Sequence, residues 1–192
     1  MRSAAAAIER LCDPDAEVSA HYVIARTGEV VPLVAEEMRA WHAGVGSWKG
    51  QDDINSRSIG IELDNDGTSP FSEPLMHALE TLMPQIMDRW DIPAIGVIGH
   101  SDMAPGRKID PGPKFDWLRL EKQGLAFRTL STISPQDTSA NSFRTLAQNA
   151  GYTCPAEDMD LLYAVRLRHR PWAKGPLCKA DFASLTSAPQ LT

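Results

Sequence analysis

Residues 99–112 have the sequence Gly-His-Ser-Asp-Met-Ala-Pro-Gly-Arg-Lys-Ile-Asp-Pro-Gly, a loop rich in proline and glycine with a histidine near one end and an aspartate near the other. The apolar run 95–98 before it has the composition of a buried strand, so we expect His100 at the carboxyl end of that strand. Such a loop turns back easily and would bring His100 and Asp110 to one point. Imidazole and carboxylate are both good zinc ligands, and a catalytic zinc needs three protein ligands and one open position. Taken alone, however, such a pair is more often a surface histidine and a turn-capping aspartate.

The sequence before this loop alternates between strand and helix patterns. Runs of β-branched and aromatic residues predict strands at 21–25, 30–34 and 58–63, the first two forming a hairpin. The last strand is expected to be buried, with Glu62 near its end. Apolar residues spaced by three and four predict a helix over 74–90, which Pro84 should kink or split. This pattern is typical of an α/β fold with a mixed central β-sheet flanked by helices.

The composition divides the chain into three regions. Residues 1–125 carry the α/β pattern, 126–141 are rich in Ser, Thr, Gln and Pro and are expected to be a linker, and 142–187 are expected to form a small helical module. About 45 residues is small for an independent core, so the module should lean on the first domain. Its basic run, 166–170, is most simply a charged helix face.

Composition also excludes several classes of protein. The 192-residue chain has a formal net charge of -6 with mixed signs, which gives no electrostatic footprint for nucleic-acid binding. Its apolar runs are too short for a transmembrane segment, and residues 1–9 are too polar for a signal-peptide core. The three cysteines are far apart and do not predict a disulfide framework. We therefore expect a cytoplasmic protein; if a missing N-terminus carried a signal, it would be periplasmic or outer-membrane-associated.

Residues 99–113 closely resemble the second half of the zinc site of type-2 N-acetylmuramoyl-L-alanine amidases, a family related to peptidoglycan-recognition proteins. Three upstream landmarks, at 19–22, 39–44 and 55–62, resemble that family in order and spacing. The resemblance covers roughly residues 1 to 120, and the combination is specific although each motif alone is weak. It implies the fold of these amidases for the α/β region.

The resemblance assigns roles residue by residue. His100 and Asp110 match two zinc ligands, and the implied cofactor is Zn²⁺. Glu62 matches the acidic residue that activates the zinc-bound water, and Lys108 matches the residue that stabilises the tetrahedral oxyanion. These roles suit amide hydrolysis, because a poor electrophile needs both an activated nucleophile and charge stabilisation on its carbonyl oxygen.

The remaining motif residues carry weaker expectations. Trp41, His42 and Asn55 are candidate substrate-binding residues, since an indole stacks on a sugar face, but Trp41 fits the core equally well. His21 is expected to be a packed and hydrogen-bonded core residue, and His77 is expected to be solvated.

The family's third zinc ligand is a histidine on a strand that comes just before the first helix. Here the sequence opens directly into that helix, which we expect to end near Asp13 and Pro14. We therefore expect that the true start lies upstream of Met1 or that the chain is truncated. The in-frame coding sequence upstream of Met1 tests this expectation, because it must encode a strand with a histidine.

The resemblance predicts an enzyme that hydrolyses the amide bond between N-acetylmuramoyl, or anhydromuramoyl, and L-alanine in peptidoglycan or its fragments. We expect the protein to be a monomer. The alternative is a non-catalytic peptidoglycan-binding protein, because the first zinc ligand is absent from this chain. An unrelated α/β hydrolase has little support, since no Gly-x-Ser-x-Gly motif is present. Residues 142–187 resemble a short helical peptidoglycan-binding domain, and a structural cap explains them equally well.

Overall fold

The structure is a computed structural model that describes residues 3–127, 137–183 and 185. The chain forms two compact units. Unit 1 comprises the described residues of Met1–Val45, Asp53–Pro93 and Lys114–Asp116. Unit 2 comprises those of Gly46–Asp52, Ala94–Pro113 and Trp117–Thr192. The boundaries of these units differ from those of the regions proposed from composition, because both units contain residues of 1–125. The proposed regions stay a prediction. Most of the expected linker, 126–141, lies outside the described residues.

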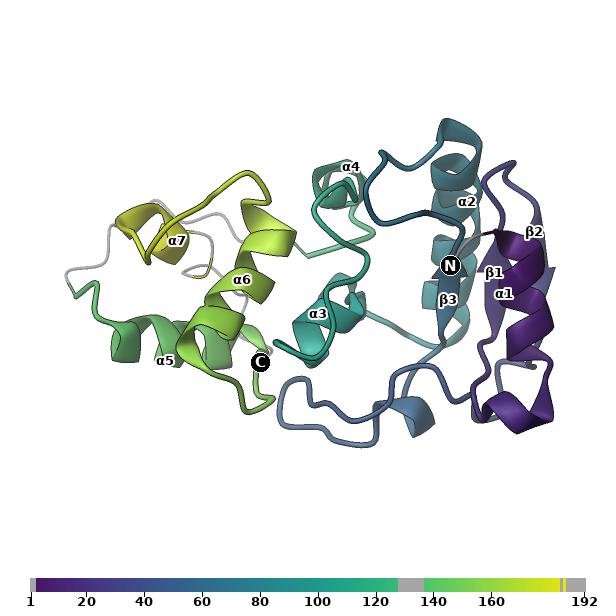
Figure 1. The fold of residues 1–192 in the computed structure, drawn as a ribbon, viewed down its shortest axis with the longest axis horizontal. Coiled ribbons are helices and arrows are strands. Elements are labelled where there is room, and N and C mark those ends of the chain that lie inside the picture. Colours follow the sequence, from purple (N-terminus) through teal and green to yellow (C-terminus); the bar gives the residue numbers. More distant parts are fainter. Residues whose placement is uncertain (1–2, 128–136, 184, 186–192) are drawn as a thin grey trace. The chain divides into compact units, whose positions relative to one another are not determined.

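Unit 1 contains the sheet, which has the strand order β2-β1-β3 (Figure 1). Its strands are β1 (Tyr22–Ile24), β2 (Val30–Pro32) and β3 (Ile61–Leu63). The β1 and β2 strands are antiparallel, which confirms the predicted hairpin, whereas β1 and β3 are parallel, so the sheet is mixed as expected. The β3 strand is half-buried rather than buried, because only β1 pairs with it among the described strands.

Two helices of unit 1, α1 (Ala4–Leu11) and α2 (Glu73–Arg89), contact β1. The α2 helix buries one apolar stripe, as its spacing predicts: Leu75, Met76, Leu79, Met83 and Ile86. The expected split at Pro84 does not occur, and α2 is continuous through it. Pro84 is exposed, so water can bond the carbonyl that the proline leaves without an amide partner. Short 3-10 helices span Pro14–Ala16 and Ile54–Ser56.

Unit 2 is helical in its described residues. Its helices are α3 (His100–Met103), α4 (Trp117–Lys122), α5 (Ala140–Ala150), α6 (Asp158–His169) and α7 (Lys179–Ala183), with a 3-10 helix at Ala94–Gly96. The α6 helix lies at the centre and contacts α3, α5 and α7. The helices α5, α6 and α7 lie largely in the region where the sequence predicts a small helical module. Their core includes Phe143, Ala147, Tyr152, Leu161, Val165 and Phe182.

The strand predicted at 95–98 is wrong. The carbonyl oxygen of Ile95 accepts a hydrogen bond from the Trp48 indole at 3.4 Å, and that of Val97 accepts one from the Arg168 guanidinium at 3.1 Å. Side chains thus occupy carbonyls that a strand would offer to its neighbour. A short apolar run is compatible with either outcome, so periodicity could not separate them.

The basic run at 166–170, predicted as a charged helix face, has two of its arginines inside the protein. Arg166 is 6% exposed and Arg168 is 5% exposed. Each forms an ion pair with a fully buried carboxylate, Arg166 with Asp181 at 2.7 Å and Arg168 with Asp102 at 2.8 Å. A buried arginine stays charged and needs such a partner, and both partners lie far away in the sequence.

Two further features bear on the expected class of protein. The thiols of Cys12, Cys154 and Cys178 are free. The described helices include none with the length and apolar character that a membrane span requires.

Candidate functional site

The loop after Gly99 folds back on itself, as its composition predicts. The Nδ1 atom of His100 and the Oδ2 atom of Asp110 are in direct contact. The Ser101 amide donates to the Asp110 carbonyl oxygen at 3.0 Å, and the Lys108 amide donates to that of Ala104 at 3.0 Å. Backbone hydrogen bonds therefore hold the two ends of the loop together. They bring the imidazole of His100 next to the carboxylate of Asp110.

Gly99 is required where the loop closes. A Cβ atom at this position would lie 2.5 Å from the Cδ atom of Pro111, closer than real contacts allow. The Gly99 amide donates to the Oδ2 atom of Asp102 at 2.8 Å, and Asp102 is fully buried. The start of α3, and with it the histidine, is thus fixed by tight packing and a buried carboxylate.

The charge state of Asp110 suits metal binding. Partial desolvation raises the pKa of Asp110, but the hydrogen bond to His100 and the nearby Lys108 ammonium oppose it, so the pKa lies below its usual range. A ligating carboxylate has to be deprotonated, and Asp110 meets that condition at neutral pH. Lys108 itself is half-buried.

Glu62 belongs to unit 1, whereas His100, Lys108 and Asp110 belong to unit 2. Glu62 is half-buried in β3 and is paired in register with Val23 of β1. It is the middle residue of the strand rather than its end. Parallel pairing with a central strand gives this carboxylate a rigid backbone.

The three candidate substrate-binding residues differ in exposure. Trp41 is 53% exposed and is therefore not a core residue, and the guanidinium of Arg39 lies 4.0 Å from its ring centroid. The half-buried His42 has its Nε2 atom 3.3 Å from the Ser58 hydroxyl. Arg39 opens the landmark 39–44, but the sequence assigned it no role; its stack on Trp41 becomes visible only in the structure.

Asn55 is buried, and its Oδ1 atom accepts hydrogen bonds from the backbone amides of His42 at 3.0 Å and Ala43 at 2.8 Å. It therefore organises the backbone that presents Trp41 and His42. A direct contact between Asn55 and substrate stays a prediction.

We expect Asn55→Ala to lower the free energy of unfolding by about 1–3 kcal/mol per buried donor left unpaired. The reason is that two amides lose one shared acceptor in an environment with little water. Urea denaturation measures the loss, with the exposed Asn149→Ala as the matched control. Equal stability of the two variants would contradict the structural role of Asn55.

His21 and His77 lie as predicted. His21 is 1% exposed; its Nδ1 atom accepts from the Gly60 amide at 2.9 Å, and its Nε2 atom lies 3.0 Å from the Met38 carbonyl oxygen. Both ring nitrogens are engaged, so His21 is a structural histidine. His77 is exposed on α2.

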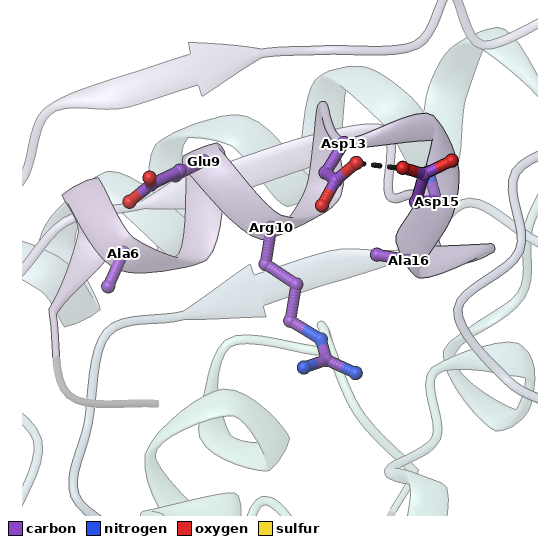
Figure 2. Close-up of a pocket in the computed structure, with 6 residues that line it drawn as sticks. All are labelled: Ala6, Glu9, Arg10, Asp13, Asp15 and Ala16. Carbon is purple, nitrogen blue, oxygen red and sulfur yellow. Dashed lines mark hydrogen bonds between the residues drawn. The ribbon is translucent and has the colours of Figure 1, made fainter.

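The described residues contain no cluster of three or more His, Cys, Asp or Glu side chains that could hold a metal ion. The His100–Asp110 pair supplies two donors of the types that zinc prefers. A surface hollow beside α1, shown in Figure 2, is lined by two alanines and four charged residues: Ala6, Glu9, Arg10, Asp13, Asp15 and Ala16. None of these is a predicted site residue.

Comparison with known families gives a match that includes both the sheet and the loop 99–112. The family model described as N-acetylmuramoyl-L-alanine amidase (Amidase_2) matches residues 1–113. The chain belongs to this amidase family.

Two curated amidases illustrate the similarity. The chain is 42% identical over 118 residues to the 1,6-anhydro-N-acetylmuramyl-L-alanine amidase AmpD of Enterobacter cloacae. This match covers 56% of this chain and 63% of that protein. It is 38% identical over 127 residues to the N-acetylmuramoyl-L-alanine amidase AmiD of Escherichia coli, covering 58% of this chain and 46% of that protein. The chain thus spans less than two thirds of the length of either relative.

Two solved structures match far more of the chain. The complex of Escherichia coli AmiD with the substrate anhydro-N-acetylmuramic acid-L-Ala-D-gamma-Glu-L-Lys has a TM-score of 0.83 at 28% identity, covering 94% of this chain and 81% of that chain. Pseudomonas aeruginosa AmpDh3 has a TM-score of 0.82 at 30% identity, covering 94% and 84%. Since the family model ends at residue 113, this coverage extends into the helices that follow it.

Proposed function

We propose that this amidase hydrolyses the amide bond between N-acetylmuramoyl, or anhydromuramoyl, and L-alanine in peptidoglycan fragments, with a zinc ion as cofactor. The observation that carries the proposal is the meeting of His100 with Asp110 at the closed loop of a chain that belongs to this family. The substrate bound in the AmiD complex, an anhydromuramoyl peptide, supports this substrate class.

His100 and Asp110 are the proposed zinc ligands, because their donor atoms suit zinc and already meet. Bound zinc would lower the pKa of a water molecule to around 7 and polarise the substrate carbonyl. Their contact supplies two of the three protein ligands that a catalytic zinc site uses, so the proposal requires one more.

Glu62 is the proposed general base. Its carboxylate would take a proton from the attacking water and then deliver it to the nitrogen of L-alanine as the amide bond breaks. The Lys108 ammonium would stabilise the negative charge that develops on the carbonyl oxygen. The exposed indole of Trp41 offers a flat face for a sugar ring, and His42 a polar group beside it in sequence.

A non-catalytic peptidoglycan-binding protein is the second candidate. It is favoured by the two-donor group, because the described residues offer no third donor at that point. The two candidates differ in one measurable respect, since only the enzyme consumes its ligand.

The test is to incubate the purified protein, supplied with zinc, with an anhydromuramoyl-tripeptide and to follow the products by mass spectrometry. The expected result is free anhydro-N-acetylmuramic acid and free tripeptide in equal amounts. Binding of the tripeptide derivative by calorimetry without any cleavage would establish the second candidate. Intact sacculi in a parallel reaction distinguish the polymer from its fragments as substrate.

Two other expectations stay predictions. Light scattering after size-exclusion chromatography tests the monomer, and cell fractionation tests the cytoplasmic location.

A further inference from the structure

The side chain of Asp102, two residues after His100, is fully buried and receives hydrogen bonds from three directions. Its Oδ2 atom accepts from the Gly99 amide at 2.8 Å and from the Arg168 guanidinium at 2.8 Å. Its Oδ1 atom accepts from the Tyr152 hydroxyl at 2.9 Å. Two of these three donors come from residues beyond the end of the family match at residue 113.

Arg168 holds both sides of the turn that carries His100. One guanidinium nitrogen bonds Asp102, and another donates to the Val97 carbonyl oxygen at 3.1 Å. The guanidinium also lies 4.0 Å from the ring centroid of Trp117. That indole in turn approaches Gly99, where a Cβ atom would be 3.3 Å from it.

Tyr152 is equally fixed. It is 2% exposed, and its ring packs edge-on against Trp48 at a centroid distance of 5.1 Å. Neither donor can leave Asp102 without disturbing the packed core of unit 2. Both belong to the same compact unit as His100 and Asp110.

We propose that Arg168 and Tyr152 are positioning residues for the zinc-binding segment: through Asp102 they fix the turn 99–102 and so hold His100 towards Asp110. This inference rests on the proposed function, because it gives the helices after residue 113 a part in the same site. These helices then complete the catalytic unit, and a detachable binding module is the competing hypothesis.

The physical reason is the cost of an unpaired buried charge. Without Arg168, the Asp102 carboxylate loses its buried counter-charge. Turning towards water would then lower the free energy of the carboxylate. It would then release the Gly99 amide, and the backbone that orients His100 would open more often. Outer-shell groups that orient a metal ligand commonly control its affinity in this way.

The test compares two buried arginines of the same helix. Arg168→Met removes the proposed positioning group, and Arg166→Met is the matched control, because Arg166 is similarly buried but bonds Asp181, Gly175 and Pro176. Hydrogen exchange by mass spectrometry is measured on the zinc-free proteins, in peptides that cover residues 97–104. A zinc titration against a competing chelator follows on the same samples.

We expect Arg168→Met to speed exchange in 97–104 by about tenfold or more. We expect it to weaken zinc binding by about 10- to 100-fold. Arg166→Met should change neither quantity, although it too lowers the melting temperature. Should Arg168→Met fail to fold, Tyr152→Phe provides the second variant, since it keeps the ring and deletes one hydrogen bond; its effects should be smaller and in the same direction.

Equal exchange in the two arginine variants, or unchanged exchange in Arg168→Met and Tyr152→Phe, would overturn the inference. The exchange measurement needs no metal and no turnover. Failure of the proposed function is a separate result, because it would appear as absent cleavage of the anhydromuramoyl-tripeptide by the unmodified protein.

Discussion

Replacing His100 by alanine is expected to remove most of the zinc that the protein holds, and Asp110→Ala is expected to do the same. Each change deletes one of the two donors that the structure brings together. The loss in zinc affinity should exceed the roughly 10- to 100-fold that removal of an outer-shell partner costs. Activity should fall in parallel. Atomic absorption after dialysis measures the zinc content.

The matched control for this experiment is His77→Ala. His77 is an exposed histidine on α2, so its loss changes the histidine count without touching the loop. Its zinc content should equal that of the unmodified protein. Full zinc occupancy in both His100→Ala and Asp110→Ala would show that these two residues are not ligands.

Glu62→Gln is expected to lower kcat by roughly a hundredfold or more, the usual scale for a lost general acid or base. The zinc content should stay nearly unchanged. The amide has almost the shape of the carboxylate, so β3 keeps its pairing with β1, but the amide cannot take a proton from water. Steady-state kinetics on the anhydromuramoyl-tripeptide, at matched zinc content, measures the effect.

Glu29→Gln is the control for this change. It removes the same charge from an exposed position next to β2, and kcat should not change. A near-normal kcat in Glu62→Gln would move the general base to another residue.

Local sequence patterns predicted the parts of the fold that local physics decides. The hairpin of β1 and β2 follows from two β-branched runs around a turn, and α2 follows from its apolar stripe. The strand prediction for 95–98 failed because tertiary structure decides which groups donate to its carbonyl oxygens. These donors are the side chains of Trp48 and Arg168. No window of sequence around the run contains both.

The candidate site divides in the same way. His100 and Asp110 are ten residues apart, joined by a loop whose glycines and prolines force a return, so their meeting could be predicted. The Asp102–Arg168 pair spans 66 residues, and its arginine lies in a run that looked like a solvated surface. A buried ion pair produces no periodic pattern in the sequence. Nothing near either residue shows that the two side chains meet.

The same pair has a consequence for the timing of synthesis. A ribosome adds about 5–20 residues per second, so roughly 3 to 13 s separate the translation of Asp102 from that of its partner 66 residues later. Throughout that interval the nascent loop carries the Asp102 carboxylate without the guanidinium that pairs with it in the folded chain. If Arg168 positions His100 as proposed, the pair of His100 and Asp110 takes its final arrangement only when α6 has emerged. A ribosome that stalls before Arg168 would then leave a chain that includes all of residues 1–113, which the family model matches, but lacks the arginine that pairs with Asp102.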